Sequence, residues 1–307
     1  MSAPPSHPQR GLAESLLVVI CVIWALGFLW TKDALGSADP MTFLALRFGV
    51  GAVLLTPLAR GALFHPQALR GGVMMGALLF LGYVLQTSGL VYTTPARSGF
   101  ITGMCVVLVP FASLLIFKRM PGLPAMGGVV LAALGLYLLT SGVGDVNAPP
   151  TSTLLGDALT LAGSAVYAVH ITLTERWSRR APPVALVGVQ LWVVALLSLA
   201  TLPFVEIRFE STQLLWTGVL LCGGLASAFA ISVQTWAQAR TTAVRAAVIY
   251  SLEPVFTAFL SSFMGHDVLG LREWSGGALV ILGVLVAEVG AHLLARRRPL
   301  AADVPQA

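Results

Sequence analysis

Apolar stretches of roughly 20 residues recur along the chain from Leu12 to Leu294, separated by short polar breaks. Each stretch is long enough to cross the ~30 Å hydrocarbon core of a bilayer as a helix. The breaks carry turn-forming residues, such as Asp39-Pro40 and Pro182-Pro183. The pattern predicts ten transmembrane helices, over residues 12–32, 41–59, 71–92, 96–117, 121–141, 154–176, 184–204, 212–237, 243–264 and 272–294.

The longest polar break divides these predicted helices into two sets of five. It runs over residues 142–153 and contains Gly, Asn and Pro. We therefore expect an N-terminal tail, a first five-helix repeat, a linker, a second five-helix repeat and a basic C-terminal tail. Their boundaries are 1–11, 12–141, 142–153, 154–295 and 296–307.

The two halves of the chain resemble each other in sequence. A shift of 148 residues aligns 76–140 with 224–288 at sixteen identities in 65 positions, and it pairs Gln86 with Gln234 and Arg97 with Arg245. A shift of 143 places Glu14 on Asp157, Trp24 on Tyr167 and Arg47 on Gln190. Because each half has an odd number of helices, the second copy must lie upside down in the membrane. We expect an all-α polytopic membrane protein whose two inverted five-helix repeats surround a central cavity, an architecture typical of transporters.

Composition supports the membrane assignment. The chain is 57% hydrophobic and 10% charged, whereas soluble proteins carry about 25% charged residues. With the N-terminus inside, twelve Lys and Arg residues fall on the cytoplasmic side and four on the outer side. This asymmetry predicts a multi-pass protein of the cytoplasmic membrane with both termini in the cytoplasm. The net charge of +5 then reflects topology and does not indicate a nucleic-acid partner.

Glu253 is the most notable ionisable residue inside a predicted helix, where charged groups are costly. It lies about ten residues into the ninth helix, near mid-membrane. Pro254 follows it and crowds the carbonyl of Tyr250, so the helix should bend there. A proton or substrate-amine site fits this position; a kink whose acid is neutralised by a structural partner fits it too.

Two arginines occupy equivalent positions at the starts of the fourth and ninth helices. Arg97 and Arg245 would bind an anionic substrate group, or would cap loops and reach water near the headgroups. Arg245 also shares a helical face with Glu253, eight residues further on, so the two are candidates for a pairing through a helix bend or a water. Arg47, inside the second helix, is expected to snorkel or to bind a helix-end carbonyl, and Glu14 to be an acid favoured by a helix start. The predicted coupling and gating residues are Glu253, Pro254, Arg245, Arg97 and Pro110.

A second set of residues combines aromatic surface with a few polar groups, the mixture found in small-molecule pockets. Gln86 and Gln234 are mid-helix amides that occupy equivalent positions in the two halves. Hydrogen bonding between helices or ordinary packing would also account for such residues. The three cysteines have neither metal nor redox spacing and are expected to be buried. The predicted substrate-binding residues are Trp24, Tyr83, Gln86, Tyr167, His170, Gln234, Trp236 and Tyr250.

Over residues 12–295 the chain resembles the drug/metabolite transporter superfamily, in particular its ten-helix EamA-type members. The matching stretches are Trp24–Lys32, Leu46–Phe48, Tyr92–Gly103, Leu252–Val255 and Gly276–Gly283. The resemblance implies a basket of helices around a cavity, alternating access, and notable roles for Trp24, Lys32, Arg47, Glu253 and Pro254. The chain departs from the common first-helix pattern, which has small polar residues where Leu26 and Phe28 stand.

These features predict a secondary transporter that exports small metabolites such as amino acids. A multidrug exporter or an exchanger of the same fold is the main alternative; a channel or a membrane-embedded enzyme is less favoured. No Lys follows a Gly as in a P-loop, and neither His-Glu-x-x-His nor Gly-x-Ser-x-Gly is present, so neither an enzyme nor a cofactor or metal is expected. The expected partners are a small-molecule substrate, the lipid bilayer and, as a candidate coupling ion, protons, in a monomer or weak dimer.

Overall fold

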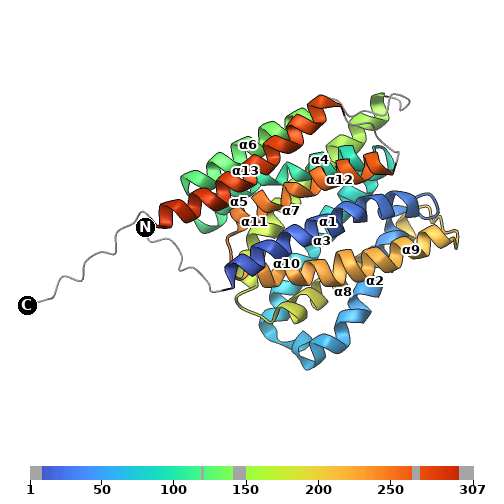
Figure 1. Cartoon of the computed structure of the whole chain (residues 1–307). Coiled ribbons are helices and arrows are strands. Elements are labelled where there is room, and N and C mark those ends of the chain that lie inside the picture. Colours follow the sequence, from blue (N-terminus) through green and yellow to red (C-terminus); the bar gives the residue numbers. More distant parts are fainter. Residues whose placement is uncertain (1–8, 119–120, 141–149, 265–269, 297–307) are drawn as a thin grey trace, which may run out of the picture.

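The computed structural model describes residues 9–118, 121–140, 150–264 and 270–296. Apart from one isolated bridge between Ala38 and Phe209, the regular elements of these residues are helices (Figure 1). Within these described ranges, eight helical stretches are long and apolar enough to cross a membrane, and two shorter apolar helices accompany them. The expectation of an all-α polytopic membrane protein is confirmed at this level. The predicted tails up to residue 8 and from 297, and residues 142–149 of the predicted linker, lie outside the described residues.

The first half of the chain follows the predicted helices closely. Its elements are α1 (Arg10–Ala34), α2 (Pro40–Ala59), the 3-10 helix η1 (Arg60–Phe64), α3 (Pro66–Val91), α4 (Pro95–Gly103), α5 (Cys105–Phe117) and α6 (Leu123–Thr140). Proline stands in the first turn of α2, α3 and α4, where its missing amide costs nothing.

The second half has the same general plan. Its elements are α7 (Pro150–Trp177), α8 (Pro183–Thr201), the 3-10 helix η2 (Leu202–Phe204), α9 (Gln213–Leu221), the π-helix η3 (Cys222–Phe229), α10 (Ala230–Gln238), α11 (Ala243–Tyr250), α12 (Leu252–Phe263) and α13 (Leu271–Arg296). Helix α7 begins at Pro150, four residues inside the segment predicted as a linker.

Two predicted helices are broken in the middle. The ninth bends as expected: α11 ends at Tyr250, whose carbonyl Pro254 would crowd, and α12 begins at Leu252. The fourth breaks at Met104, between α4 and α5, which the sequence did not predict. The two breaks touch, because a Cβ added to Gly103 would lie only 2.9 Å from Cγ of Pro254. The absent side chain at Gly103 therefore makes room for the proline of the opposite half.

Glycines bring helices from the two halves of the chain close together. Helices α6 and α13 lie side by side along one edge of the molecule (Figure 1). A Cβ at Gly128 would lie 2.6 Å from the carbonyl oxygen of Gly283, and one at Gly135 would lie 2.6 Å from that of Gly276. Only helices without side chains at these points can approach so closely.

Helix α1 runs through the bundle beside α10 and α12 (Figure 1). One buried apolar cluster joins α1 to α4, α5 and the broken helix α11–α12, and a second joins α2, α3 and α8. Trp24 of α1 packs against both clusters. The boundary between the two clusters therefore lies in the middle of the protein, where a cavity opens.

Candidate functional site

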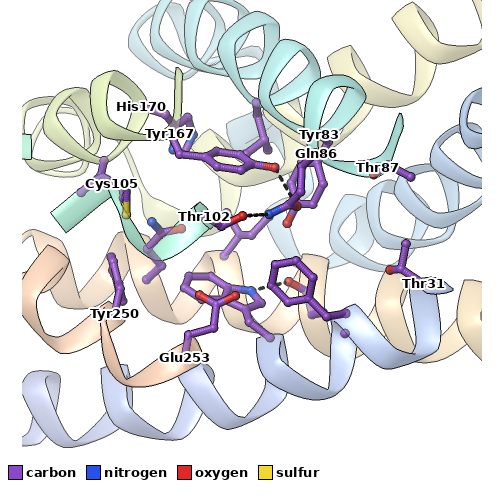
Figure 2. A pocket seen from close by; sticks show the side chains of 18 of the residues that line it. Thr31, Tyr83, Gln86, Thr87, Thr102, Cys105, Tyr167, His170, Tyr250 and Glu253 are labelled. Carbon is purple, nitrogen blue, oxygen red and sulfur yellow. Dashed lines mark hydrogen bonds between the residues drawn. The ribbon is translucent and has the colours of Figure 1, made fainter. Parts of the chain in front are cut away.

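The structure contains a cavity of about 90 Å³ between the two halves of the chain. Residues of α1 to α5 line it from the first half, and residues of α7, η3, α10, α11 and α12 line it from the second. It brings together seven of the eight predicted substrate-binding residues. They are Trp24 and Gln234, together with five that are labelled in Figure 2: Tyr83, Gln86, Tyr167, His170 and Tyr250.

Among the residues that the structure describes, Glu253 is the only acid that lines the cavity. It occupies the first turn of α12, immediately after the helix break. Its carboxylate has no hydrogen-bond or ion-pair partner among the described residues, and its backbone carbonyl accepts a bond of 2.9 Å from Thr257. Figure 2 shows the carboxylate pointing into the cavity, across from Tyr167 and Gln86. The structure gives the acid no neutralising partner among the described residues, an arrangement compatible with the hypothesis of a proton or substrate-amine site.

Arg47 supplies a positive charge to the same cavity. The residue is only 4% exposed. Its Nε donates to Oγ of Ser227 at 3.0 Å and its Nη2 donates to the Tyr83 hydroxyl at 3.4 Å. The guanidinium also lies over the Tyr83 ring, 4.7 Å from its centroid. The expectation that Arg47 snorkels or binds a helix-end carbonyl is therefore wrong. Arg47 has no acidic partner among the described residues, so its charge is available to a ligand.

Gln86 ties together three helices at the cavity wall. Its Nε2 donates to Oγ1 of Thr102 at 2.9 Å, and its Oε1 accepts from the Tyr167 hydroxyl at 3.1 Å. These bonds, drawn in Figure 2, fix Tyr167 and Thr102 against α3. Gln86 therefore links neighbouring helices and also lines the cavity. Gln234 lines the cavity from α10, its counterpart in the other half.

Aromatic rings form the apolar surface of the cavity. Trp24 and Tyr250 meet edge to face, with centroids 5.4 Å apart, and Tyr83 and Tyr167 do the same at 5.6 Å. Nε1 of Trp24 donates to the carbonyl of Ala226 at 3.0 Å, which anchors α1 to the π-helix η3. These rings are held in place before any ligand binds.

His170 also lines the cavity, but its ring is engaged in the wall. Its Nε2 lies 2.8 Å from Oε1 of Gln190, the residue that corresponds to Arg47 in the other half. This hydrogen bond links α7 to α8 in the wall of the cavity.

Trp236 is the predicted substrate-binding residue that does not reach the cavity. Its ring is partly buried and carries the guanidinium of Arg240, 3.9 Å from the ring centroid. The reason is helical geometry: Gln234 faces the cavity, and a residue two positions later points about 200° away.

The two predicted gating arginines also lie outside the cavity lining, and each forms an ion pair. Arg97 binds Asp157, with Nη2 2.5 Å from Oδ2 and Nε 2.8 Å from Oδ1. Nη1 of Arg245 lies 3.3 Å from Oε1 of Glu14. The expected pairing of Arg245 with Glu253 is therefore wrong. Glu14 is not simply a helix-start acid but an inter-helix partner. The prolines of the predicted gating set, Pro110 and Pro254, are buried and stand outside the lining as well.

Several residues of the cavity were not singled out from the sequence. Thr102 and Cys105 line it from the break between α4 and α5. The repeat could have revealed both, because the 148-residue shift places Thr102 on Tyr250 and Cys105 on Glu253. Arg47 was noticed as a charge but not assigned to the cavity. Among the described residues no cluster of His, Cys, Asp and Glu side chains is arranged to hold a metal ion.

The cavity thus combines one carboxylate, one guanidinium and a set of fixed aromatic rings. A carboxylate and a guanidinium can bind the two ends of a zwitterion by charge-assisted hydrogen bonds. Aromatic walls suit an apolar substituent on the same ligand.

Comparison with known proteins identifies the family of the chain. The sequence model of the EamA-like transporter family matches residues 11–141 and 154–288. An uncharacterized transporter of Archaeoglobus fulgidus is 31% identical over 281 residues, which cover 92% of this chain and 87% of that protein. The uncharacterized inner membrane transporter YhbE of Escherichia coli is 24% identical over 303 residues, covering 92% of each chain. A solved crystal structure shares the fold, with a TM-score of 0.74 and 21% identity, over 94% of this chain and 99% of that one.

Proposed function

Because the chain belongs to the EamA-like transporter family, we propose that it is a secondary transporter that exports small metabolites such as amino acids. Export takes place across the cytoplasmic membrane by alternating access. The observation that carries this proposal is the presence of Arg47 and Glu253, of opposite charge and without ion-pair partners among the described residues, in one cavity between the two halves. Membrane transport of a small substrate follows from the family; the substrate class and mechanism are our proposal.

We propose that the two halves are inverted repeats of five membrane-spanning helices each. Matching features support this. Thr94 caps α4 by accepting from the amide of Arg97, and Thr242 caps α11 by accepting from the amide of Arg245. Each of these helices breaks eight to nine residues after its cap, α4 before Cys105 and α11 before Leu252. The family model also matches one stretch on each side of the segment 142–153.

The dimensions of the cavity favour a small substrate over a drug. Pockets for drug-sized ligands measure about 300–1,000 Å³, whereas this cavity measures about 90 Å³. In the proposed complex the substrate carboxylate binds Arg47, the ammonium binds Glu253, and the side chain lies against Trp24 and Tyr250. This arrangement favours amino acids with an apolar side chain.

Glu253 provides a simple route to coupling. A carboxylate buried at membrane depth is costly unless a counter-charge neutralises it. In the loaded cavity that counter-charge is the substrate ammonium. In the empty cavity it is a proton, taken up after the substrate has left. One proton therefore returns for each amine exported, and the same residue binds substrate and couples transport.

Orientation follows from the charge distribution of the loops. With both termini in the cytoplasm, the Glu14 end of α1 faces the cytoplasm and the Lys32 end faces outward. Substrate then enters the cavity from the Glu14 end and leaves at the Lys32 end.

Uptake by proteoliposomes that contain the purified protein tests this function. Uptake of labelled aromatic, aliphatic and cationic amino acids is compared between these proteoliposomes and empty liposomes, with a pH gradient imposed in each direction. We expect saturable uptake of apolar amino acids, with a raised KM in Arg47→Gln and no response to the pH gradient in Glu253→Gln. Arg70→Gln and Glu206→Gln, which change exposed residues, should transport as the parent does. Folded protein that transports no amino acid would refute the substrate class, and the assay would then turn to other small amines and drugs.

A further inference from the structure

Two ion pairs join the two halves of the chain. Arg97 of α4 binds Asp157 of α7 through two short contacts, 2.5 Å and 2.8 Å. Arg245 of α11 binds Glu14 of α1 at 3.3 Å. In each pair the arginine comes from one half and the acid comes from the other. Both pairs are partly buried, with side-chain exposures of 25% and 20% in the first and 10% and 13% in the second.

The two pairs are equivalent by the internal repeat. The shift of 148 residues carries Arg97 onto Arg245, and the shift of 143 carries Glu14 onto Asp157. Each arginine stands at the third position after a capping threonine. Chance pairing of surface charges would not reproduce the same residues from both halves. The two contacts are therefore copies of one structural device, placed twice.

The copies lie at opposite ends of the cavity. Glu14 stands near the start of α1, and Lys32 near its end, about 27 Å further on by helical rise. Nζ of Lys32 donates to the carbonyl of Thr93, at 2.8 Å, immediately before the helix that carries Arg97. The pair Arg97–Asp157 thus belongs to the Lys32 end and the pair Arg245–Glu14 to the Glu14 end. Between them α1 contributes Trp24 to the cavity wall.

Each arginine is carried by a short helical segment with a break at its cavity end. Helix α4 has nine residues and ends before Met104; α11 has eight and ends before Ser251. Beyond the breaks Cys105 and Glu253 line the cavity. A broken helix lets its outer segment tilt without moving the inner one. The arginine at the far end then meets or leaves the acid of the opposite half.

We infer that Arg97–Asp157 and Arg245–Glu14 are the two gates of the transporter, opened in alternation by the tilting of α4 and of α11. This inference rests on the proposed alternating access. Opening either gate exposes the cavity to one side only. The gates differ in strength: Arg97 holds Asp157 by several charge-assisted bonds, whereas Glu14 is shared with Arg10 at 2.6 Å and Thr241 at 3.4 Å.

The native Cys105 offers a direct test, because its side chain lines the cavity (Figure 2). In a protein whose other cysteines are replaced by Cys21→Ala and Cys222→Ala, a membrane-impermeant thiol reagent reports when water reaches the cavity. Labelling rates are measured from each side, in right-side-out and inside-out vesicles. Retained melting temperature shows that each variant is folded.

We expect Asp157→Asn to raise Cys105 labelling at least tenfold from the Lys32 side and to leave or lower it from the Glu14 side. Glu14→Gln should produce the reverse pattern. Exchanging the charges in one protein, Arg97→Asp with Asp157→Arg, should restore the parental rates. Glu206→Gln, an exposed loop acid, is the matched control and should change neither rate.

Purely structural ion pairs predict a different outcome: both variants would lower the melting temperature and raise labelling from both sides alike. That result, or labelling unchanged from either side, overturns the gating assignment. The proposed function fails separately. If the two variants raise Cys105 labelling from opposite sides as expected but the protein transports no amino acid, the gating assignment is supported and the proposed substrate class is wrong. If the protein transports an amino acid but the Cys105 labelling rates of both variants equal those of the parent, the gating assignment fails and the proposed function remains.

Discussion

The substitution Arg47→Gln tests the assignment of Arg47 as the carboxylate-binding residue. The glutamine keeps a hydrogen-bond donor toward Ser227 but removes the charge that has no acidic partner among the described residues. A hydrogen bond to a charged group contributes about 1.5–3 kcal/mol. At about 1.4 kcal/mol per tenfold change, KM for an apolar amino acid should rise about 10- to 150-fold.

The magnitude depends on the charge of the ligand, and this provides the internal control. The carboxamide of the same amino acid carries no negative charge, so it cannot form an ion pair with Arg47 and its hydrogen bond to the guanidinium is weaker. The unmodified protein should therefore prefer the acid over the amide, and Arg47→Gln should bring the two KM values to within a few-fold of each other. Arg47→Lys keeps the charge but loses the planar guanidinium, so its preference for the acid over the amide should lie between those of the parent and of Arg47→Gln.

Proteoliposome uptake over a range of substrate concentrations gives the KM values for the acid and for the amide. Arg70→Gln, which removes an exposed arginine, is the matched control. A loss of uptake alone is ambiguous, because a buried arginine also supports Tyr83 through a hydrogen bond and a cation–π contact. The decisive quantity is the ratio of the KM for the amide to the KM for the acid. If folded Arg47→Gln still prefers the acid as strongly as the parent does, Arg47 does not bind the carboxylate and the reasoning fails.

Three further predictions follow from the same geometry. Uptake by Glu253→Gln should no longer respond to an imposed pH gradient, because the amide cannot exchange a proton; a preserved response measured by pH-jump uptake would contradict the coupling role. Gly135→Leu should abolish folding, since even a Cβ would lie 2.6 Å from the carbonyl of Gly276, whereas Gly277→Ala, with its nearest neighbour at 3.4 Å, should cost less than about 1 kcal/mol; detergent melting curves compare the two. Trp236→Phe should leave KM within twofold of the parent, because this ring lies outside the cavity, and a larger change would show that the cavity extends to α10's outer face.

The sequence predicts the positions of the helices well, because hydrocarbon admits only long apolar segments whose backbone bonds are satisfied internally. It predicts the break at Tyr250 because Pro254 has a local and unavoidable effect on the preceding turn. The break at Met104 has no such local cause. It lies beside a tertiary contact between Gly103 and Pro254 of the other half, residues 151 positions apart in the sequence. Hydropathy contains no information about that contact.

The partners of the charged residues show the same limit. Helical spacing correctly puts Arg245 and Glu253 on one face, and this made their pairing attractive. The pairing requires the arginine to bend along its own helix, whereas Glu14 of α1 lies within 3.3 Å from the side. A partner on a neighbouring helix wins because contact across helices depends on packing, which the spacing along one helix does not encode. Arg47 was misassigned for the same reason: its depth was visible, but not the direction in which it points.

The internal repeat carries more information than either hydropathy or spacing, and its mismatches matter as much as its matches. Matched positions are structural and paired across the halves: the capping threonines, the arginines of the proposed gates and the glycines that join α6 to α13. The charged residues of the cavity have no charged counterpart in the repeat, since Arg47 aligns with Gln190 and Glu253 aligns with Cys105. The proposed alternating access needs two similar ends that open in turn, whereas the proposed zwitterionic substrate has two different poles and needs an asymmetric site. A duplicated scaffold with one arginine and one glutamate placed in only one copy each meets both requirements.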